Sequence, residues 1–204
     1  MLKIVVGPMC AGKTSTLIKD YNEFDGRKII IDYEIGQKEM LYNSHVVTHD
    51  GLKEQTYKCK VLHDSLDIYK QEGNFRMSHE FLIPYTRKNA PDMYEVVDKV
   101  IKSEAIFINE AQFFPDLYEF VVSNLQKEKS IYLYGLDGDF QQNKMVQLLD
   151  LVPLCDSIVK LKSKCICGKD AIFTFRDSPE TVQYLPNATY IPLCRSCFLN
   201  KKNR

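Results

Sequence analysis

Short apolar runs alternate with longer amphipathic segments along most of the chain. Four runs have the length and composition of strands buried in a parallel sheet, and they span residues 4–6, 28–31, 105–108 and 131–136. Three amphipathic segments predict helices, at residues 15–24, 91–102 and 117–126. The alternation predicts an α/β fold in which helices flank a parallel sheet.

Residues 65–89 follow neither pattern. Aromatic and charged side chains are mixed there, and a Glu-Gly-Asn sequence suited to a turn interrupts them at residues 72–74. We interpret this stretch as an insertion in the main domain. The sequence leaves open whether the insertion folds over a ligand site, contributes to an oligomer interface or is tolerated surface.

The balance of charges narrows the choice of partners. The chain has 204 residues, and 27 lysines and arginines balance 27 aspartates and glutamates. A neutral chain has no overall field to attract nucleic acid or an anionic membrane, so neither partner is expected. No apolar run approaches the roughly 20 residues of a membrane span, and the N-terminus does not resemble a signal sequence. These features favour a cytoplasmic protein that binds a small molecule.

Residues 7–14, Gly-Pro-Met-Cys-Ala-Gly-Lys-Thr, match the phosphate-loop pattern G-x-x-x-x-G-K-[ST] between a predicted strand and a predicted helix. The backbone N–H groups of such a loop surround a triphosphate at the positive end of the following helix. The lysine at the end of the pattern binds phosphate oxygens, and the threonine after it binds Mg²⁺. The alternative is a glycine turn that matches by chance. The predicted nucleotide-binding residues are Gly7, Pro8, Met9, Cys10, Ala11, Gly12, Lys13 and Thr14.

Four of the seven cysteines gather near the C-terminus as C-x-C and C-x-x-C pairs: Cys165, Cys167, Cys194 and Cys197. Four thiolates suit a tetrahedral structural Zn²⁺, and a segment this short needs metal to fold because it cannot build its own core. The alternative is reduced, separately buried cysteines, and the C-x-C pair is tighter than usual. We therefore predict a nucleotide-binding domain at residues 1–160 and a zinc-binding domain at residues 161–204.

The other cysteines, Cys10, Cys59 and Cys155, are predicted to be small packing residues. Cys10 is the one of these three that could react, because a loop at a helix N-terminus favours the thiolate.

Asn109 and Glu110 follow directly after a predicted buried strand. In phosphate-loop enzymes this strand ends beside the phosphates, and an aspartate at its end usually supports Mg²⁺. Asparagine stands at that position here. Glu110 comes next and could accept a proton from an attacking hydroxyl, which makes it the candidate catalytic base. The alternative is an ordinary solvated glutamate.

Taken in order, these motifs resemble the thymidine kinases of the cytosolic, zinc-containing type. The resemblance is carried by residues 7–14, 110–116, 135–140, 151–154 with 159–161, and the four-cysteine module. It implies transfer of the γ-phosphate of ATP to the 5′-hydroxyl of deoxythymidine, with Mg²⁺ at the transfer site and structural Zn²⁺. It also implies a homo-oligomer, a tetramer in that family, and a flexible loop that closes over the base. We call this predicted loop, residues 176–189, the lasso.

The resemblance also implies roles for individual residues. Glu110 is the base that deprotonates the 5′-hydroxyl, while Asn109 and Gln112 join the phosphate loop in the cofactor site. The walls of the thymine pocket are Met9, Phe113, Leu136, Phe140, Thr174 and Tyr190.

This chain departs from the family pattern at several positions. Asn109 replaces an aspartate, Gln142 an arginine and Met145 an aromatic residue, and an Asp-x-Arg motif reads Gly-Gln-Lys at residues 36–38. These departures keep a second hypothesis open, a catalytically weakened relative that binds nucleotides as a regulator or sensor. A third, a zinc ribbon that binds nucleic acid, is disfavoured by the neutral charge.

Overall fold

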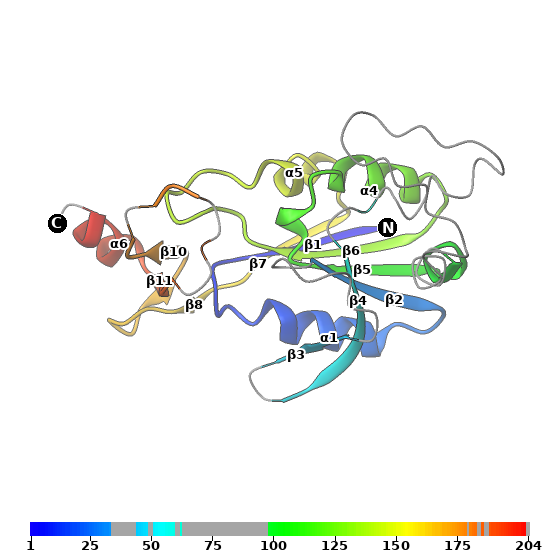
Figure 1. Cartoon of the computed structure of the whole chain (residues 1–204), viewed down its shortest axis with the longest axis horizontal. Coiled ribbons are helices and arrows are strands. Elements are labelled where there is room, and N and C mark those ends of the chain that lie inside the picture. Colours follow the sequence, from blue (N-terminus) through cyan, green and yellow to red (C-terminus); the bar gives the residue numbers. More distant parts are fainter. Residues whose placement is uncertain are drawn as a thin grey trace.

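The structure is a computed structural model that describes residues 1–33, 44–48, 51–59, 62, 98–178, 180–182, 185 and 188–202. Within these residues, seven strands form one sheet in the order β3-β4-β2-β5-β6-β1-β7 (Figure 1). The strands are β1 (Leu2–Val6), β2 (Lys28–Tyr33), β3 (Ser44–Val47), β4 (Lys53–Cys59), β5 (Ala105–Asn109), β6 (Ser130–Gly135) and β7 (Ser157–Lys160).

Six of the seven strands are parallel, and only β3 runs antiparallel to its neighbour β4. The predicted parallel sheet is therefore confirmed. Each of the four predicted apolar runs is a strand of this sheet.

Helices cover both faces of the sheet, with α1 on one face and α4 and α5 on the other (Figure 1). Among the described residues of the main domain, the helical segments are α1 (Lys13–Glu23), η1 (Ala111–Phe113), α4 (Leu117–Leu125), α5 (Val146–Leu149) and η2 (Val152–Leu154), together with residues 98–102. The predicted helices at 15–24 and 117–126 are confirmed with small shifts at their ends. Of the predicted helix at 91–102, residues 98–102 are helical and the earlier ones lie outside the described residues.

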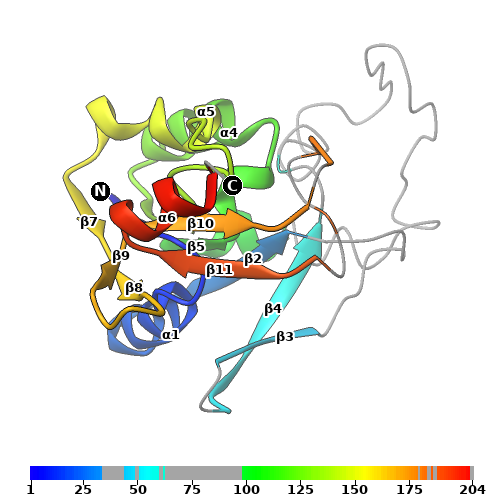
Figure 2. The same cartoon turned by 90° about the vertical axis from the view of Figure 1, so that its left-hand side faces the viewer.

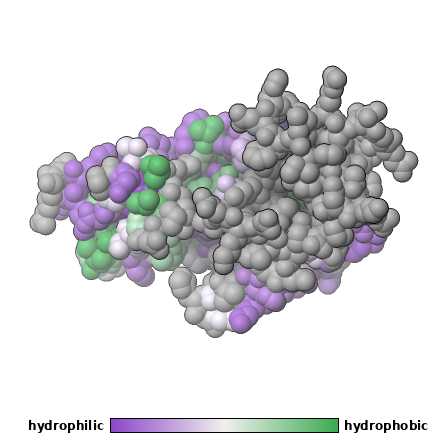
Figure 3. All heavy atoms as spheres, in the orientation of Figure 1, coloured by the Kyte–Doolittle hydropathy of each residue, from purple (hydrophilic) through white to green (hydrophobic). Residues whose placement is uncertain are grey.

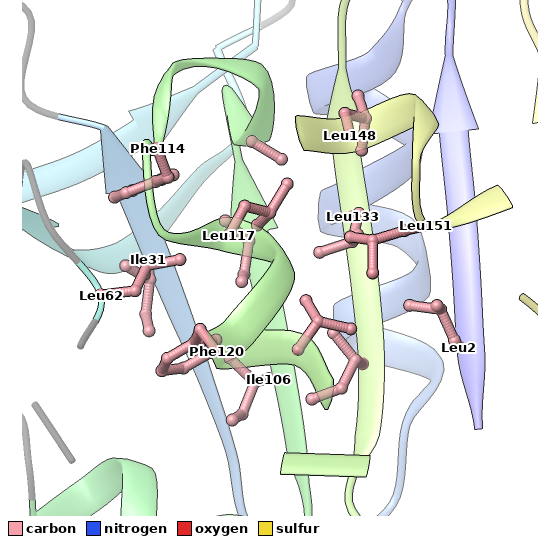
Figure 4. Packing of buried hydrophobic residues seen from close by; sticks show 14 of the residues in the cluster. Leu2, Ile31, Leu62, Ile106, Phe114, Leu117, Phe120, Leu133, Leu148 and Leu151 are labelled. Atoms are coloured by element: carbon pink, nitrogen blue, oxygen red, sulfur yellow. The ribbon is translucent and has the colours of Figure 1, made fainter. Parts of the chain in front are cut away.

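Strand β5 shows how the sequence directs side chains to the two faces. All five of its residues are buried, and successive side chains of a strand point to opposite faces. Ile106 and Ile108 pack in the cluster that holds Leu117 and Phe120 of α4 (Figure 4). Phe107 packs instead with α1 and stacks on Tyr132, with ring centroids 4.3 Å apart. This continuous apolar run is what a strand covered on both faces requires.

The C-terminal part forms a small module of two hairpins and a helix, which Figure 2 shows in front of the sheet. Its elements are β8 (Ser163–Lys164), β9 (Asp170–Ala171), β10 (Phe173–Arg176), β11 (Tyr190–Leu193) and α6 (Arg195–Lys202). The predicted lasso is the connection between β10 and β11, which the structure describes in part. The module lies beyond the carboxyl ends of the parallel strands, on the side of residues 7–12 (Figure 1).

The surface of the module mixes hydrophobic and hydrophilic patches (Figure 3). Ile166 and Leu199 are among its exposed apolar side chains. No helix in the described part of the chain is long and apolar enough to cross a membrane.

Two edge elements were not predicted. The β3–β4 hairpin is rich in polar residues and lacks a continuous apolar run, and β7 is exposed along its whole length. Edge strands bury fewer side chains, so the apolar pattern that identifies central strands is weak in them. The predicted insertion at 65–89 and the Gly-Gln-Lys motif at 36–38 lie outside the described residues.

Candidate active site

The glycine-rich loop joins the carboxyl end of β1 to the N-terminus of α1. Gly12 has φ +81° and Gly7 has φ +155°, and a Cβ on Gly7 would lie 2.7 Å from the carbonyl oxygen of Leu161. Glycine is therefore needed at residue 7, where the chain after β7 comes close, and at residue 12, where the backbone makes a left-handed turn.

Cys10, in the same loop, adopts φ +59° and is exposed, so its prediction as a packing residue is wrong. Cys155 packs against the core, as predicted.

Lys13 folds back over this loop. Its Nζ donates hydrogen bonds to the carbonyl oxygens of Gly7, at 3.2 Å, and Pro8, at 2.8 Å. Burial lowers the pKa of the Lys13 amine, while the nearby carboxylates of Glu110 and Asp137 oppose that shift. The amine, the loop and two carboxylates thus meet at one end of the sheet.

Glu110 follows β5 in a left-handed backbone conformation, with φ +48°. This conformation is unfavourable for a residue with a Cβ, and strain of this kind gathers at functional sites. The Gln112 Nε2 donates to Glu110 Oε2 at 2.7 Å, and the backbone N–H of Leu136 donates to Gln112 Oε1 at 3.0 Å. Gln112 thus holds the Glu110 carboxylate in place.

The position of Gln112 depends on a glycine in the adjacent strand. A Cβ on Gly135 would lie 2.4 Å from Gln112 Oε1. Glycine at the end of β6 therefore makes room for the side chain that positions Glu110.

Asn109 lies beside a carboxylate that the sequence did not single out. The Asn109 Nδ2 donates to Asp32 Oδ1 at 2.9 Å, and both residues are buried at the ends of the adjacent strands β5 and β2. The sequence signal for Asp32 is its position directly after the apolar run 28–31. Its importance could not be recognised without knowing that the strands ending in Asp32 and Asn109 are neighbours in the sheet.

Asp137, in the loop after β6, was also missed as a separate candidate. It forms an ion pair with Lys160 of β7. Further along this loop, Asp139 accepts hydrogen bonds from the backbone N–H groups of Gln141 and Asn143, each at 2.8 Å. These bonds shape the turn that carries Phe140 and gives Gln142 φ +71°.

The cysteine-containing module contacts the glycine-rich loop directly. The backbone N–H of Met9 donates to Thr174 Oγ1 at 3.0 Å, and Ser163 Oγ donates to the carbonyl oxygen of Cys10 at 2.9 Å. Two contacts in different strands of the module therefore fix its position against the loop.

Arg176 links the predicted lasso to the loop that carries Phe140. Its guanidinium lies 3.6 Å from the centroid of the Phe140 ring and donates to the carbonyl oxygen of Val182 at 2.7 Å. The backbone N–H of Leu185 donates to the hydroxyl of Tyr190 at 2.8 Å. Met9, Phe140, Thr174 and Tyr190 thus gather around the junction of the two parts.

The two remaining candidates for the pocket wall lie on the sheet side. Leu136 is half-buried next to Gln112, and the ring of Phe113 packs against Tyr33 with centroids 5.4 Å apart. Met145 is buried in the core.

The four cysteines of the module come together. The sulfur atoms of Cys165, Cys167, Cys194 and Cys197 all lie within 4.8 Å of one another. The tight C-x-C pair fits because Gly168, with φ +82°, turns the chain and its N–H donates to the carbonyl oxygen of Cys165 at 2.8 Å. A tetrahedral metal with bonds of about 2.3 Å requires sulfur atoms about 3.8 Å apart. The group could therefore hold a metal ion.

The environment of Cys165 favours a thiolate. Burial raises the pKa of this thiol, but hydrogen bonds from the backbone N–H groups of Cys167 and Cys194 and from their thiols lower it to about 6. A thiolate is the form that binds metal.

These features define an α/β protein with a glycine-rich loop between its first strand and first helix, a carboxylate beside that loop, and a C-terminal four-cysteine module. The family model for thymidine kinase matches residues 1–77 and 52–198, so the chain belongs to the thymidine kinase family. The resemblance seen in the sequence motifs is thereby confirmed.

Individual relatives carry the same name. The chain is 32% identical to a thymidine kinase of Oryza sativa subsp. japonica over 98% of its own length, and it spans 66% of that protein. It is 30% identical to thymidine kinase a of Arabidopsis thaliana, covering 74% of it. It is also 30% identical to the thymidine kinase of Sheeppox virus, and this match covers 97% of the chain and 96% of the viral protein.

Proposed function

We propose that this protein is a thymidine kinase that transfers the γ-phosphoryl group of ATP to the 5′-hydroxyl of deoxythymidine in nucleotide salvage. The observation that carries the proposal is the meeting of Lys13 and Glu110 at one site in a chain of this family. A phosphate-binding amine and a carboxylate that lie at the carboxyl edge of the same parallel sheet are what phosphoryl transfer to an alcohol requires.

In the proposed reaction, Glu110 accepts the proton of the 5′-hydroxyl while the 5′-oxygen bonds to the γ-phosphorus and ADP leaves. Gln112 keeps the Glu110 carboxylate aimed at the hydroxyl through its 2.7 Å hydrogen bond. Lys13 leaves the carbonyl oxygens of the loop and binds the phosphate oxygens instead, where its charge stabilises the transferring group. Backbone N–H groups of residues 10–12 and the N-terminus of α1 bind the remaining phosphates.

Two metal ions fit the side chains present. Mg²⁺ would be held with ATP by Thr14 and supported through water by Asn109, and it would offset charge on the phosphates. Zn²⁺ would be held by the four cysteine sulfurs, whose spacing suits a tetrahedral ion. The zinc would supply folding free energy to the module.

The base is proposed to bind where the two parts meet. Met9, Phe113, Leu136 and Phe140 would form the sheet side of the thymine pocket, and Thr174, Tyr190 and the lasso the other side. An apolar wall favours the 5-methyl group of thymine, and backbone groups of the lasso can read its polar edge. A homo-oligomer, a tetramer in the family, and a cytoplasmic location remain predictions.

The test is phosphate transfer from labelled ATP to thymidine, deoxyuridine and deoxycytidine, with Glu110→Gln as the test variant. We expect thymidine to be preferred and turnover to fall about 10²- to 10⁴-fold in Glu110→Gln, the usual contribution of a general base. Glu119→Gln is the matched control, because Glu119 is an exposed glutamate on α4, and its turnover should not change. Nucleotide binding without transfer to any of the three would replace the kinase with the sensor hypothesis.

A further inference from the structure

Asp32 and Asn109 form a buried pair at the carboxyl edge of the sheet. They are register partners in the parallel strands β2 and β5, and their side chains are joined by a 2.9 Å hydrogen bond. Asp32 is 8% exposed and Asn109 is 7% exposed. A buried carboxylate needs a partner, and here the amide of Asn109 is one.

The pair points to the face of the sheet covered by α1. Ile30 and Phe107 lie two residues earlier on the same strands, and both belong to the cluster that packs against α1. Side chains two residues apart in a strand share a face. Asp32 and Asn109 therefore lie on the face where α1 begins, directly after the glycine-rich loop.

The hydrogen bond also fixes the orientation of the Asn109 amide. An ionised carboxylate can only accept, so Asn109 must turn its NH₂ group toward Asp32. The carbonyl oxygen of the Asn109 amide, which can only accept, is thereby turned away from Asp32. An amide oxygen held by a neighbouring carboxylate is more strongly polarised and better oriented toward a cation.

We propose that Asp32 and Asn109 together replace the single aspartate expected at residue 109, with Asp32 supplying the negative charge and Asn109 the oxygen that faces the Mg²⁺ shell. The charge has moved one strand across the sheet, from β5 to β2. Asp32 is thus a positioning residue that acts through Asn109. The inference rests on the proposed function only in assuming that Mg·ATP binds at the glycine-rich loop.

The test measures Mg²⁺-dependent binding of a non-hydrolysable ATP analogue, by calorimetry over a range of Mg²⁺, and of Mn²⁺ by its paramagnetic resonance signal. Asp32→Asn should weaken the apparent affinity for either cation about 10-fold, a usual effect of removing a group behind a metal ligand. The exchange Asp32→Asn with Asn109→Asp should restore it to within about 3-fold, because one carboxylate and one amide are again hydrogen bonded.

Asp20→Asn is the matched control. Asp20 is also a hydrogen-bonded, partly buried aspartate, paired with Lys3 and Tyr134, but it lies in α1 away from the strand ends. Its replacement should leave the cation dependence unchanged. Unchanged cation affinity in Asp32→Asn would overturn the proposal, and so would a loss that the exchange variant does not restore.

Because binding is the readout, failure of the inference and failure of the proposed function are distinguishable. If Asp32→Asn weakens Mg²⁺-dependent analogue binding but the protein phosphorylates no nucleoside, the inference stands and the kinase assignment falls. If thymidine is phosphorylated and Asp32→Asn behaves as the parent protein in binding, the assignment stands and the inference falls.

Discussion

The parallel sheet and the four-cysteine module hold together in different ways. Among the described residues, the sheet packs a cluster of nineteen buried residues on its α4 face and one of seven on its α1 face. The module has a buried cluster of five, and two of those are the cysteines Cys165 and Cys194. Burial alone is enough for the sheet, whereas so small a cluster cannot offset the entropy of ordering the module.

The difference matters because the site is divided between the two parts. Lys13 and Glu110, the groups proposed to act on phosphate and hydroxyl, belong to the sheet. Thr174 and Tyr190, proposed to face the base, belong to the module, and Thr174 is bonded to the glycine-rich loop. Loss of the module should therefore remove nucleoside binding while leaving the phosphate site folded.

Removing the metal should have the largest effect. A structural zinc site contributes roughly 10 kcal/mol or more to the folding of a small module. We expect chelation, or Cys194→Ser, to abolish hydrogen-exchange protection in β10 and β11 while β5 and β6 keep theirs. Thymidine phosphorylation should be lost, and binding of the ATP analogue should be weakened far less.

Cys155→Ser is the matched control for the cysteine substitution. Cys155 is half-buried against the core of the sheet and lies outside the metal cluster. The Cys155→Ser protein should retain one zinc per chain and its thymidine turnover. If the zinc-free module kept the exchange protection of the loaded form, burial would be sufficient there and the contrast between the two parts would be wrong.

The second prediction concerns strain inside the stable part. Glu110 and Glu128 both have left-handed backbone conformations, with φ +48° and +61°. Replacing either by glycine should relieve about 1 kcal/mol of strain. Glu128→Gly should therefore raise the free energy of unfolding by about that amount with unchanged turnover. Glu110→Gly should be as stable as the parent or slightly more so, yet lose about 10²- to 10⁴-fold in turnover.

Denaturant unfolding and steady-state kinetics on the two variants check this prediction. A Glu110→Gly protein that is about 2 kcal/mol less stable than the parent, the contribution of one hydrogen bond to a charged group, would show that the Gln112 hydrogen bond, rather than function, explains why glutamate is kept in that conformation.

The contrast between the two parts also explains what could be predicted from the sequence. Central strands such as β5 are covered on both faces, so their apolar runs were recognised, while the exposed edge strand β7 was not. The glycine-rich loop and the cysteines were found because their chemistry lies in local spacing. Asp32 and Asp137 were missed because their importance comes from neighbours distant in the chain, Asn109 and Lys160. Sequence patterns do not give strand order, and strand order creates those contacts.

The third prediction compares the same truncation in the two parts. Leu133 and Leu193 are both fully buried, in the sheet and in the module. Leu133→Ala should lower the free energy of unfolding of the whole protein by about 3 kcal/mol, through lost burial and a residual cavity. Leu193→Ala should leave the main transition in place and reduce exchange protection in β10 and β11 only, even with zinc bound. A common loss of stability in both variants would mean that the two parts unfold as one unit.

The smallest expected effect tests the contact between the parts. Thr174→Val keeps the shape of the side chain and its methyl group but removes the hydroxyl that accepts from the Met9 N–H. One hydrogen bond contributes about 0.5–1.5 kcal/mol, so the KM for thymidine should rise about 2- to 10-fold with little change in kcat. Thr174→Ser keeps the hydroxyl and removes the methyl group, so it separates the two roles of this residue. If Thr174→Ser rather than Thr174→Val raises the KM, Thr174 acts as part of the apolar pocket wall, and the module is held against the loop by other contacts such as that between Ser163 and Cys10.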